Sequence, residues 1–586
     1  MKKIALMVAG LLLILFTGCE DFLDTENLTD KNTANYPATL AEAKQMVTGV
    51  YNSLSLVNAN PQKSFLFVSE LASDDRLGGA GTNDQLCQAI DLMMTSGMDM
   101  LDNFWTDRYA GVQRANTAIA KLDNCTQYDS EEQKNQFLGE AYFLRGFYYY
   151  ELASLFENIP VPTEPLAIPT PQSDPNVTWG QIISDLKQAI QLMPAKKTAS
   201  KEAGHVDKYV AEAMMARAFL FYTGFYQQAD VTLPDGSTVT KADVIGWIDD
   251  CVTNSGYVLV PDFRNLWAYT NRLTVGEYTY TSDGSGAVKN GIDSQPLRYV
   301  EDDQSINPES MFAIKYSKFA GWDTTIGYSN GYALFFGIRG GQPQEQTFPF
   351  GQGWGAGPVT PSLWNAWGTA EPTDLRRAAS ICDIRAELDP RGYVKGAAGW
   401  ADFEQETDYW SKKWTPVSSK KSDGSGYWET FEQDMYDYTS QNFQLTNIHD
   451  LILIRFADVL LMQSELKEDA IGLNKVRARV GLPSILYSLQ ALQNERRWEL
   501  AFEGIRWNDI RRWHIAETEL TKQENVKIYR SGIVDVNKPH EGGYAARYKS
   551  THGGFFPIPE SEIALSDGGL KQNTGWENTT PLYTAW

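Results

Sequence analysis

The sequence predicts a mainly α-helical protein that carries one irregular, loop-rich lobe. Apolar residues in the segment 137–155 follow one another at spacings of 4, 3, 4, 4 and 3, which is the period of one helix face. They are Phe137, Ala141, Leu144, Tyr148, Leu152 and Leu155. Between residues 321 and 368 the chain instead has eleven glycines, a density that argues against long helices. With 42% hydrophobic residues, the chain can bury a substantial core around the helices.

The first residues have the features of a secretory signal. Two lysines at positions 2 and 3 precede a 13-residue apolar run over residues 4–16, and two small residues stand directly before Cys19. A helix that spans a bilayer needs about 20 apolar residues, so residues 1–18 are predicted to be a cleaved signal peptide. Small residues before a cysteine resemble the bacterial lipobox, which predicts lipidation of Cys19. Ordinary secretion with Cys19 unmodified is the alternative.

The rest of the chain divides into four regions by composition. Alternating small and large residues in the first helical region, such as Ala213 and Ala216, would let helices approach closely. This pattern indicates tetratricopeptide-like helix pairs within a single large domain, although no strict 34-residue period occurs. The regions are an acidic tether over 19–37, a helical region over 38–255, an aromatic and glycine-rich lobe over 256–445, and a second helical region over 446–586.

Charge, cysteine and histidine content exclude several functions. A formal net charge of −23 repels phosphate backbones, so nucleic acid is not an expected ligand. After Cys19, the cysteines are spaced too widely for a metal knuckle, and the five histidines form no H-E-x-x-H motif. We therefore expect neither a metal nor a cofactor. Free buried thiols are favoured over two disulfides for the four cysteines, which are Cys87, Cys125, Cys251 and Cys382.

Four segments together resemble the SusD/RagB family of outer-membrane nutrient-binding lipoproteins. They are GEAYFLRGFYYYELASLFENIPV, LILIRFADVLLMQSEL followed by LNKVRARVGLP, NERRWELAFEGIRWNDIRRW, and FPIPESEI. The lipobox followed by DFLD is also similar to the usual opening of the family, although Thr574 stands where the family often has Pro. The resemblance implies a SusD-like fold, with the helical part bearing an irregular ligand-binding lobe.

The resemblance also implies a function and a location. Family members bind glycans, or in some cases peptides, and cover a SusC-like TonB-dependent outer-membrane transporter. By this resemblance, lipid on Cys19 anchors the protein in the outer membrane, and Glu20 and Asp21 resemble the acidic signal that directs such lipoproteins to the cell exterior. The expected function is capture of an oligosaccharide without catalysis and its delivery to the transporter. A peptide- or glycopeptide-binding module of the same fold and a glycan hydrolase are the alternatives.

Aromatic residues in the lobe are the first candidates for ligand contacts. Many flat rings among glycines cannot all pack in a core, although packing remains the alternative for each ring. The ring candidates are Trp322, Tyr328, Tyr332 and Trp354, and polar partners are expected from the loop ELASDDRLGGAGTNDQ, namely Asp75, Arg76 and Asn83. Trp105 and Asn116 match a family pattern that indicates scaffold, and Trp105 is kept as a weaker ligand candidate.

Two motifs could indicate an enzyme. GYSNG at 327–331 matches the G-x-S-x-G nucleophile elbow around Ser329, but the following YALFFGIRGG predicts strand or loop where the motif needs a helix. Glu495, Glu499 and Glu503 would lie on one helix face, where carboxylates cannot flank a glycosidic bond from two sides. Nearby arginines are expected to pair with them in a structural network.

Overall fold

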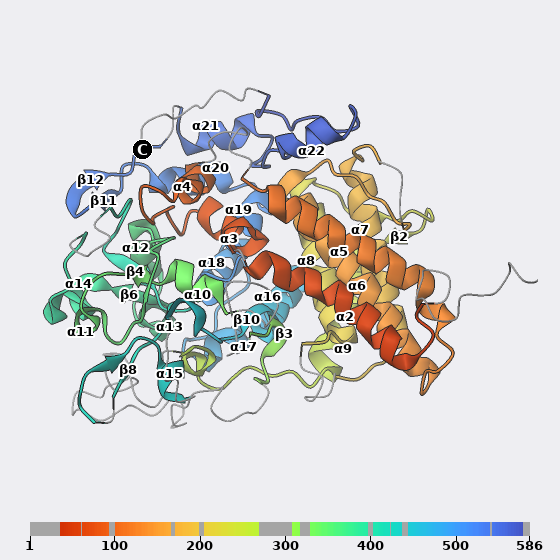
Figure 1. The fold of residues 1–586 in the computed structure, drawn as a ribbon, viewed down its shortest axis with the longest axis horizontal. Helices are drawn as coiled ribbons and strands as arrows, with labels where there is room; N and C mark the ends of the chain where they lie inside the picture. Colours follow the sequence, from red (N-terminus) through yellow and green to blue (C-terminus); the bar gives the residue numbers. More distant parts are fainter. Residues whose placement is uncertain are drawn as a thin grey trace, which may run out of the picture.

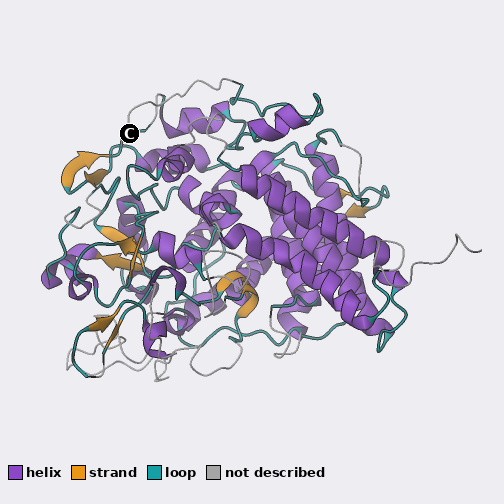
Figure 2. Ribbon diagram, in the orientation of Figure 1, coloured by secondary structure: helices purple, strands orange, loops and turns teal. Residues whose placement is uncertain are grey.

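The computed structural model describes most of the chain, and Figure 2 shows that helices dominate it. None of the helices within the described residues is both long and apolar enough to cross a membrane. The described residues are 36–59, 61–92, 100–165, 170–197, 204–268, 307–316, 329–396, 402–421, 423–435, 443–539 and 542–577.

A stack of long helices forms the first part of the molecule, on the right in Figure 1. Neighbouring helices pack in pairs, α2 against α5, α5 against α6, α6 against α7, and α7 against α8. The stack comprises α2 (Leu40–Ala59), α5 (Asp102–Lys121), α6 (Glu131–Phe156), α7 (Pro175–Leu192), α8 (Lys208–Phe225) and α9 (Lys241–Asn254). The short helices α3 (Phe65–Ala72) and α4 (Gln85–Leu92) lie outside the stack and pack against each other. A short hairpin of β1 (Val231–Thr232) and β2 (Thr238–Val239) precedes α9.

Helix α6 is the predicted helix of segment 137–155. It begins because the Ser130 side chain accepts a hydrogen bond from the backbone N–H of Gln133, which caps the first turn. The spacing predicted one buried face, but residues 143–156 are buried on every side. Helices α2, α5 and α7 and the C-terminal part of the chain surround this half of α6, so the predicted face is buried and the opposite face is buried as well.

The lobe lies on the other side of the molecule and is built from short helices and two-stranded ladders (Figures 1 and 2). Strands β6 and β7, and β8 and β9, pair antiparallel, while β4 and β5 pair parallel. Its elements are β3 (Ser310–Ile314), α10 (Gly331–Phe336), β4 (Ile338–Arg339), α11 (Gln344–Thr347), β5 (Gln352–Gly353), α12 (Pro361–Ala370), α13 (Leu375–Ser380), β6 (Ile381–Asp383), α14 (Ile384–Glu387), β7 (Tyr409–Ser411), β8 (Ser419–Lys420), β9 (Tyr427–Trp428) and α15 (Phe431–Met435).

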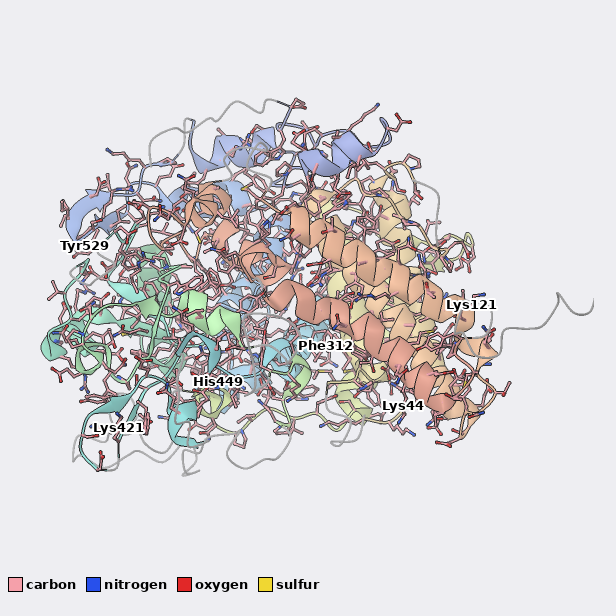
Figure 3. All side chains as sticks on the ribbon, in the orientation of Figure 1. Lys44, Lys121, Phe312, Lys421, His449 and Tyr529 are labelled. Atoms are coloured by element: carbon pink, nitrogen blue, oxygen red, sulfur yellow. The ribbon has the colours of Figure 1, made fainter. Side chains whose placement is uncertain are left out.

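The C-terminal elements join the two sides. Strand β10 pairs antiparallel with β3 of the lobe and leads directly into α16, which packs against α8 and α9. These elements are β10 (Leu451–Arg455), α16 (Phe456–Lys467), α17 (Ile471–Arg479), α18 (Leu489–Glu499), α19 (Arg506–Arg512), α20 (Ala516–Leu520), β11 (Lys527–Arg530), β12 (Ile533–Val536), α21 (Gly543–Ser550) and α22 (Glu560–Leu565). In Figure 3, Tyr529 on β11 marks one edge of the molecule, and Lys44 and Lys121 mark the opposite end of the helix stack.

Candidate functional site

Three segments that are far apart in the sequence meet at one junction. We define the junction as residues 76–84, the segment 353–359 and residues 402–406. Ala80 N donates to Gly355 O at 2.6 Å, and Gly357 N donates to Gly78 O at 3.0 Å. Glu404 N in turn donates to Ala80 O at 2.7 Å. The predicted early loop and the predicted aromatic lobe are therefore brought together.

Glycines permit this close approach. Gly79 has a φ of +65°, and a Cβ there would lie 2.3 Å from Pro358 Cδ and 2.6 Å from Gly355 O. A Cβ on Gly81 would lie 2.3 Å from an Arg339 guanidinium nitrogen and 2.7 Å from Asp402 Oδ2. A side chain at Gly79 would force the segments apart, whereas one at Gly81 would displace the side chains of Arg339 and Asp402.

Arg339 connects the three segments through its guanidinium group. Its Nη1 donates to Trp354 O at 2.8 Å and its Nη2 donates to Asp402 Oδ1 at 2.8 Å. Thr82 Oγ1 donates to Asp402 Oδ2 at 3.2 Å, and Asp84 lies 3.6 Å from Arg339. Burial alone would raise the pKa of Asp402, but the hydrogen bond and charge of Arg339 outweigh it and lower that pKa. The site thus combines fixed carboxylate oxygens with exposed hydroxyl and amide groups.

Trp354, whose backbone carbonyl oxygen accepts from Arg339, is an aromatic residue of the junction. The ring is half-buried and packs edge-on against Phe335, with ring centroids 4.6 Å apart and planes at 71°. Phe335 lies on α10, whose first turn is capped by Asn330 Oδ1 accepting from Tyr332 N and Ala333 N. Asn330 is itself held by hydrogen bonds to the carbonyl oxygens of residues 447 and 449. Packing against Phe335 on this capped helix therefore fixes the orientation of the Trp354 ring.

Of the predicted ligand contacts, two lie at the accessible face of the junction. Asn83 is exposed next to Thr82, and Trp354 is half-buried. Trp322 and Tyr328 lie outside the described residues. The remaining four are interior side chains.

Arg76 and Asp75 are engaged in buried ion pairs instead of facing solvent. Arg76 is fully buried, donates to Glu70 Oε2 at 2.6 Å and to Gly357 O at 2.6 Å, and lies between the rings of Phe336 and Phe502. Asp75 accepts from Arg497 Nη2 at 2.6 Å. Both side chains hold the start of the loop against the rest of the protein. In this structure neither side chain is accessible to a ligand.

Tyr332 and Trp105 are packing residues. Tyr332 is 1% exposed and its hydroxyl is hydrogen-bonded to Ser64 Oγ. Trp105 is 3% exposed and packs on Tyr109 and Phe156, with centroids 4.9 and 5.1 Å away. Their side chains cannot reach a ligand unless the core opens, which corrects their selection as ligand candidates.

Sequence reasoning missed Arg339, Thr82 and Asp402. A single arginine in the glycine-rich stretch FFGIRGG was a usable signal, because a charged residue among glycines next to aromatics has few structural reasons to be there. Thr82 and Asp402 gave no such signal, because their significance comes from a contact across 320 positions.

The three glutamates form a buried ion network, as expected, but their partners are not the neighbouring arginines that the sequence predicts, such as Arg496 and Arg506. The glutamates pair instead with Arg376, Arg455, Arg477, Arg479 and Lys413, which come from other elements. Helix α18 ends at Glu499, so Glu503 is not on the same helix, contrary to expectation. The charges of Arg479, Arg455 and Arg376 overcome the effect of burial and hold the pKa of Glu499 well below its usual range.

Ser329 and the cysteines have structural surroundings. A helix, α10, does follow Ser329, contrary to expectation, but the described partners of its hydroxyl are backbone atoms of Asn447, at 3.0 and 3.2 Å. The prediction of free buried thiols is confirmed for Cys87, Cys125, Cys251 and Cys382. Within the described ranges, no group of three or more His, Cys, Asp or Glu side chains is arranged to hold a metal ion.

Comparisons with known proteins agree with this architecture. A family model described as SusD family matches residues 308–576, and one described as starch-binding associating with outer membrane matches residues 21–228. The chain therefore belongs to the SusD-like family. SusD-like protein P2 from Formosa agariphila is 24% identical over 542 residues, which cover 87% of this chain and 91% of that protein.

Solved structures show the same fold. A laminarin-binding SusD-like protein is 25% identical, with a TM-score of 0.66 and coverage of 92% of this chain and 100% of the other. Surface glycan-binding protein A from Bacteroides thetaiotaomicron, solved in complex with laminarihexaose, is 20% identical with a TM-score of 0.65, over 92% of this chain and 100% of that one. The predicted mainly helical SusD-like fold is confirmed.

Proposed function

We propose that the protein captures an oligosaccharide at the junction without catalysis. The observation that carries this proposal is one half-buried tryptophan, Trp354, whose carbonyl oxygen shares the Arg339 guanidinium group with Asp402, to which Thr82 next to the exposed Asn83 is hydrogen-bonded. A sugar needs this combination, because its C–H face stacks on an aromatic ring and its hydroxyls need hydrogen-bond partners. The similarity to a laminarin-binding protein supports a glycan as the ligand.

Binding at this site should be weak. Stacking that covers ~80 Å² of an indole ring at about 25 cal/mol per Å² contributes roughly 2 kcal/mol. One or a few such contacts and some hydrogen bonds, reduced by the entropy of association, give a dissociation constant of roughly micromolar to millimolar. This range suits a protein that captures a ligand and then releases it.

The ligand then passes to a SusC-like TonB-dependent transporter in the outer membrane. Lipid on Cys19 anchors this protein to the outer face of the same membrane. Membership in a family described as associating with the outer membrane supports this location. Fractionation and surface proteolysis of cells test it: wild type should be in the outer membrane and protease-sensitive, and Cys19→Ala should leave the membrane. Co-purification of the transporter with wild type is expected, and its absence would contradict delivery.

The binding test uses the chain without residues 1–19 and titrates it calorimetrically with laminarihexaose and other oligosaccharides. Trp354→Ala should weaken binding about 10- to 30-fold, because it removes the stacking surface. Trp364→Ala is the matched control, since that ring is covered by Tyr409, with centroids 5.1 Å apart, and by Arg377, 4.2 Å away, and affinity should not change.

Reducing ends are assayed in the same solutions. New reducing ends would contradict capture without catalysis and favour the hydrolase. If the protein binds peptides but none of the glycans, its ligand is a peptide and not an oligosaccharide.

A further inference from the structure

Behind the accessible face of the junction lies a buried carboxyl group that has only neutral partners. Asp91, on α4, is 2% exposed. Its Oδ2 accepts from Gly78 N at 3.2 Å and from Gln405 Nε2 at 3.0 Å, and its Oδ1 accepts from Tyr544 OH at 3.2 Å. Among the described residues, no lysine, arginine or histidine pairs with it.

Gln405 connects Asp91 to the loop through the hydrogen bonds of its amide group. Its Oε1 accepts from Gly79 N at 3.1 Å and its Nε2 also donates to Asn537 Oδ1 at 3.0 Å. The backbone of Gln405 has a φ of +52°, so it is held in a conformation that non-glycine residues rarely adopt. Gly78 and Gly79 lead directly to Thr82 and Asn83, so these hydrogen bonds set where the polar groups of the site lie.

The titratable groups around Asp91 come from several elements. Burial, only partly offset by the hydrogen bonds from Gln405, Gly78 and Tyr544, raises the pKa of Asp91 to about 7. Burial likewise raises the pKa of Glu406 to about 7. The titratable groups facing this region are Tyr544 on α21, Glu524 behind Tyr544, Glu406 next to Gln405, and Tyr393 and Lys395 against Glu406.

We propose that Asp91 is a positioning residue of the junction, whose protonated carboxyl group keeps Gly78 and Gln405 in place and whose ionisation weakens oligosaccharide binding. This inference rests on the proposed function of the junction. When Asp91 is protonated, its proton lies on Oδ1 and the hydrogen bond with Tyr544 reverses, so that Oδ1 donates to the Tyr544 oxygen across the same 3.2 Å while Oδ2 still accepts from Gly78 and Gln405.

The sign of the effect follows from proton linkage. A carboxyl group with a raised pKa in the closed arrangement stabilises that arrangement at low pH, and this contribution is lost as pH rises through about 7. Above that pH, states in which water reaches Asp91 are favoured. Movement of Gly78 or Gln405 away from Oδ2 would let water reach it, and the loop that carries Thr82 and Asn83 then loses its fixed position.

The first experiment measures the affinity for laminarihexaose between pH 5.5 and 8.5. The wild-type association constant should fall by up to about tenfold per pH unit above 7, while Asp91→Asn should stay within about twofold because its amide mimics the protonated acid. Glu212→Gln is the matched control: it removes another buried carboxyl group, with a pKa of about 8, from α8 outside the junction, and should titrate like wild type.

Three results would overturn the proposal. The affinity of wild type could be independent of pH, the affinity of Asp91→Asn could keep the pH dependence of wild type, or the pH dependence could disappear in Glu406→Gln but not in Asp91→Asn. Circular dichroism of each variant at both pH limits excludes unfolding as the cause.

The second experiment needs no ligand. Amide hydrogen exchange at Gly78 and Gly79, expressed relative to an unstructured peptide at the same pH, should lose protection above pH 7 in wild type and not in Asp91→Asn. Unchanged protection overturns the proposal whether or not a glycan binds. Loss of protection in a protein that binds no glycan would retain the positioning role and reject the proposed function.

Discussion

Two buried carboxyl groups, Glu499 at the end of α18 and Asp91 behind the junction, have different kinds of partner. Glu499 accepts hydrogen bonds from Arg376, Arg455 and Arg479, and their charges keep it ionised far below neutral pH. Asp91 has only neutral donors, and burial brings its pKa to about 7. The first arrangement fixes charge at all physiological pH values and ties the lobe to the helices. The second arrangement lets the charge on Asp91 change with pH near neutrality.

The largest expected effect is a loss of stability on breaking the buried ion network around Glu499 and Glu503. Arg455 bonds to Glu309 at 2.7 Å, Glu499 at 2.5 Å and Glu503 at 2.6 Å with its side chain 1% exposed. Arg455→Met should lower the free energy of unfolding by about 3–5 kcal/mol, because it leaves buried carboxylates without a cation. Chemical denaturation measures this loss.

A solvent-exposed ion pair provides the control. Lys196 and Glu132 are 2.6 Å apart with side chains 66% and 54% exposed, and Lys196→Met should change stability by no more than about 0.5 kcal/mol. Equal effects of the two substitutions would contradict the importance of the buried network.

A smaller effect is expected from Glu212 in the helix stack. Burial raises its pKa to about 8, so the folded protein keeps a proton that the unfolded chain has already lost. Stability should therefore fall by roughly 2 kcal/mol between pH 6 and 8 through this group. Denaturation at both pH values should show that Glu212→Gln lacks this part of the decrease, and an identical decrease in the variant would refute the assignment.

The smallest expected effect separates binding from stability. Gly81→Ala places a methyl group against Arg339 and Asp402, and calorimetric titration with laminarihexaose should show severalfold weaker binding with little loss of stability. Gly49→Ala, on α2 with nothing within 4 Å of the added Cβ, should bind normally and be more stable by about 0.5–1 kcal/mol. Normal binding by Gly81→Ala would show that the Arg339 contacts do not shape the site.

The helices could be predicted well because their signals are local. The spacing in segment 137–155 and a capping serine at Ser130 define α6 without reference to the rest of the chain. Helix α10 could not be predicted in the same way, because its six residues lie in a glycine-rich stretch and depend on the Asn330 cap and on packing against distant segments.

The candidate site could be predicted only as two regions that would meet. Arg76 resembled a ligand contact in the sequence, but Glu70 on α3 and the two rings around it bury it. The contact from Thr82 to Asp402 and the clamp by Arg339 depend on long-range folding, which leaves no local pattern.

The most direct test is a crystal structure of the chain without residues 1–19 soaked with laminarihexaose. A sugar ring should stack on Trp354, with its hydroxyls hydrogen-bonded to side chains of the Thr82–Asn83 loop. Well-defined sugar at another surface, with Trp354 free of ligand, would contradict the central claim that the junction is the binding site.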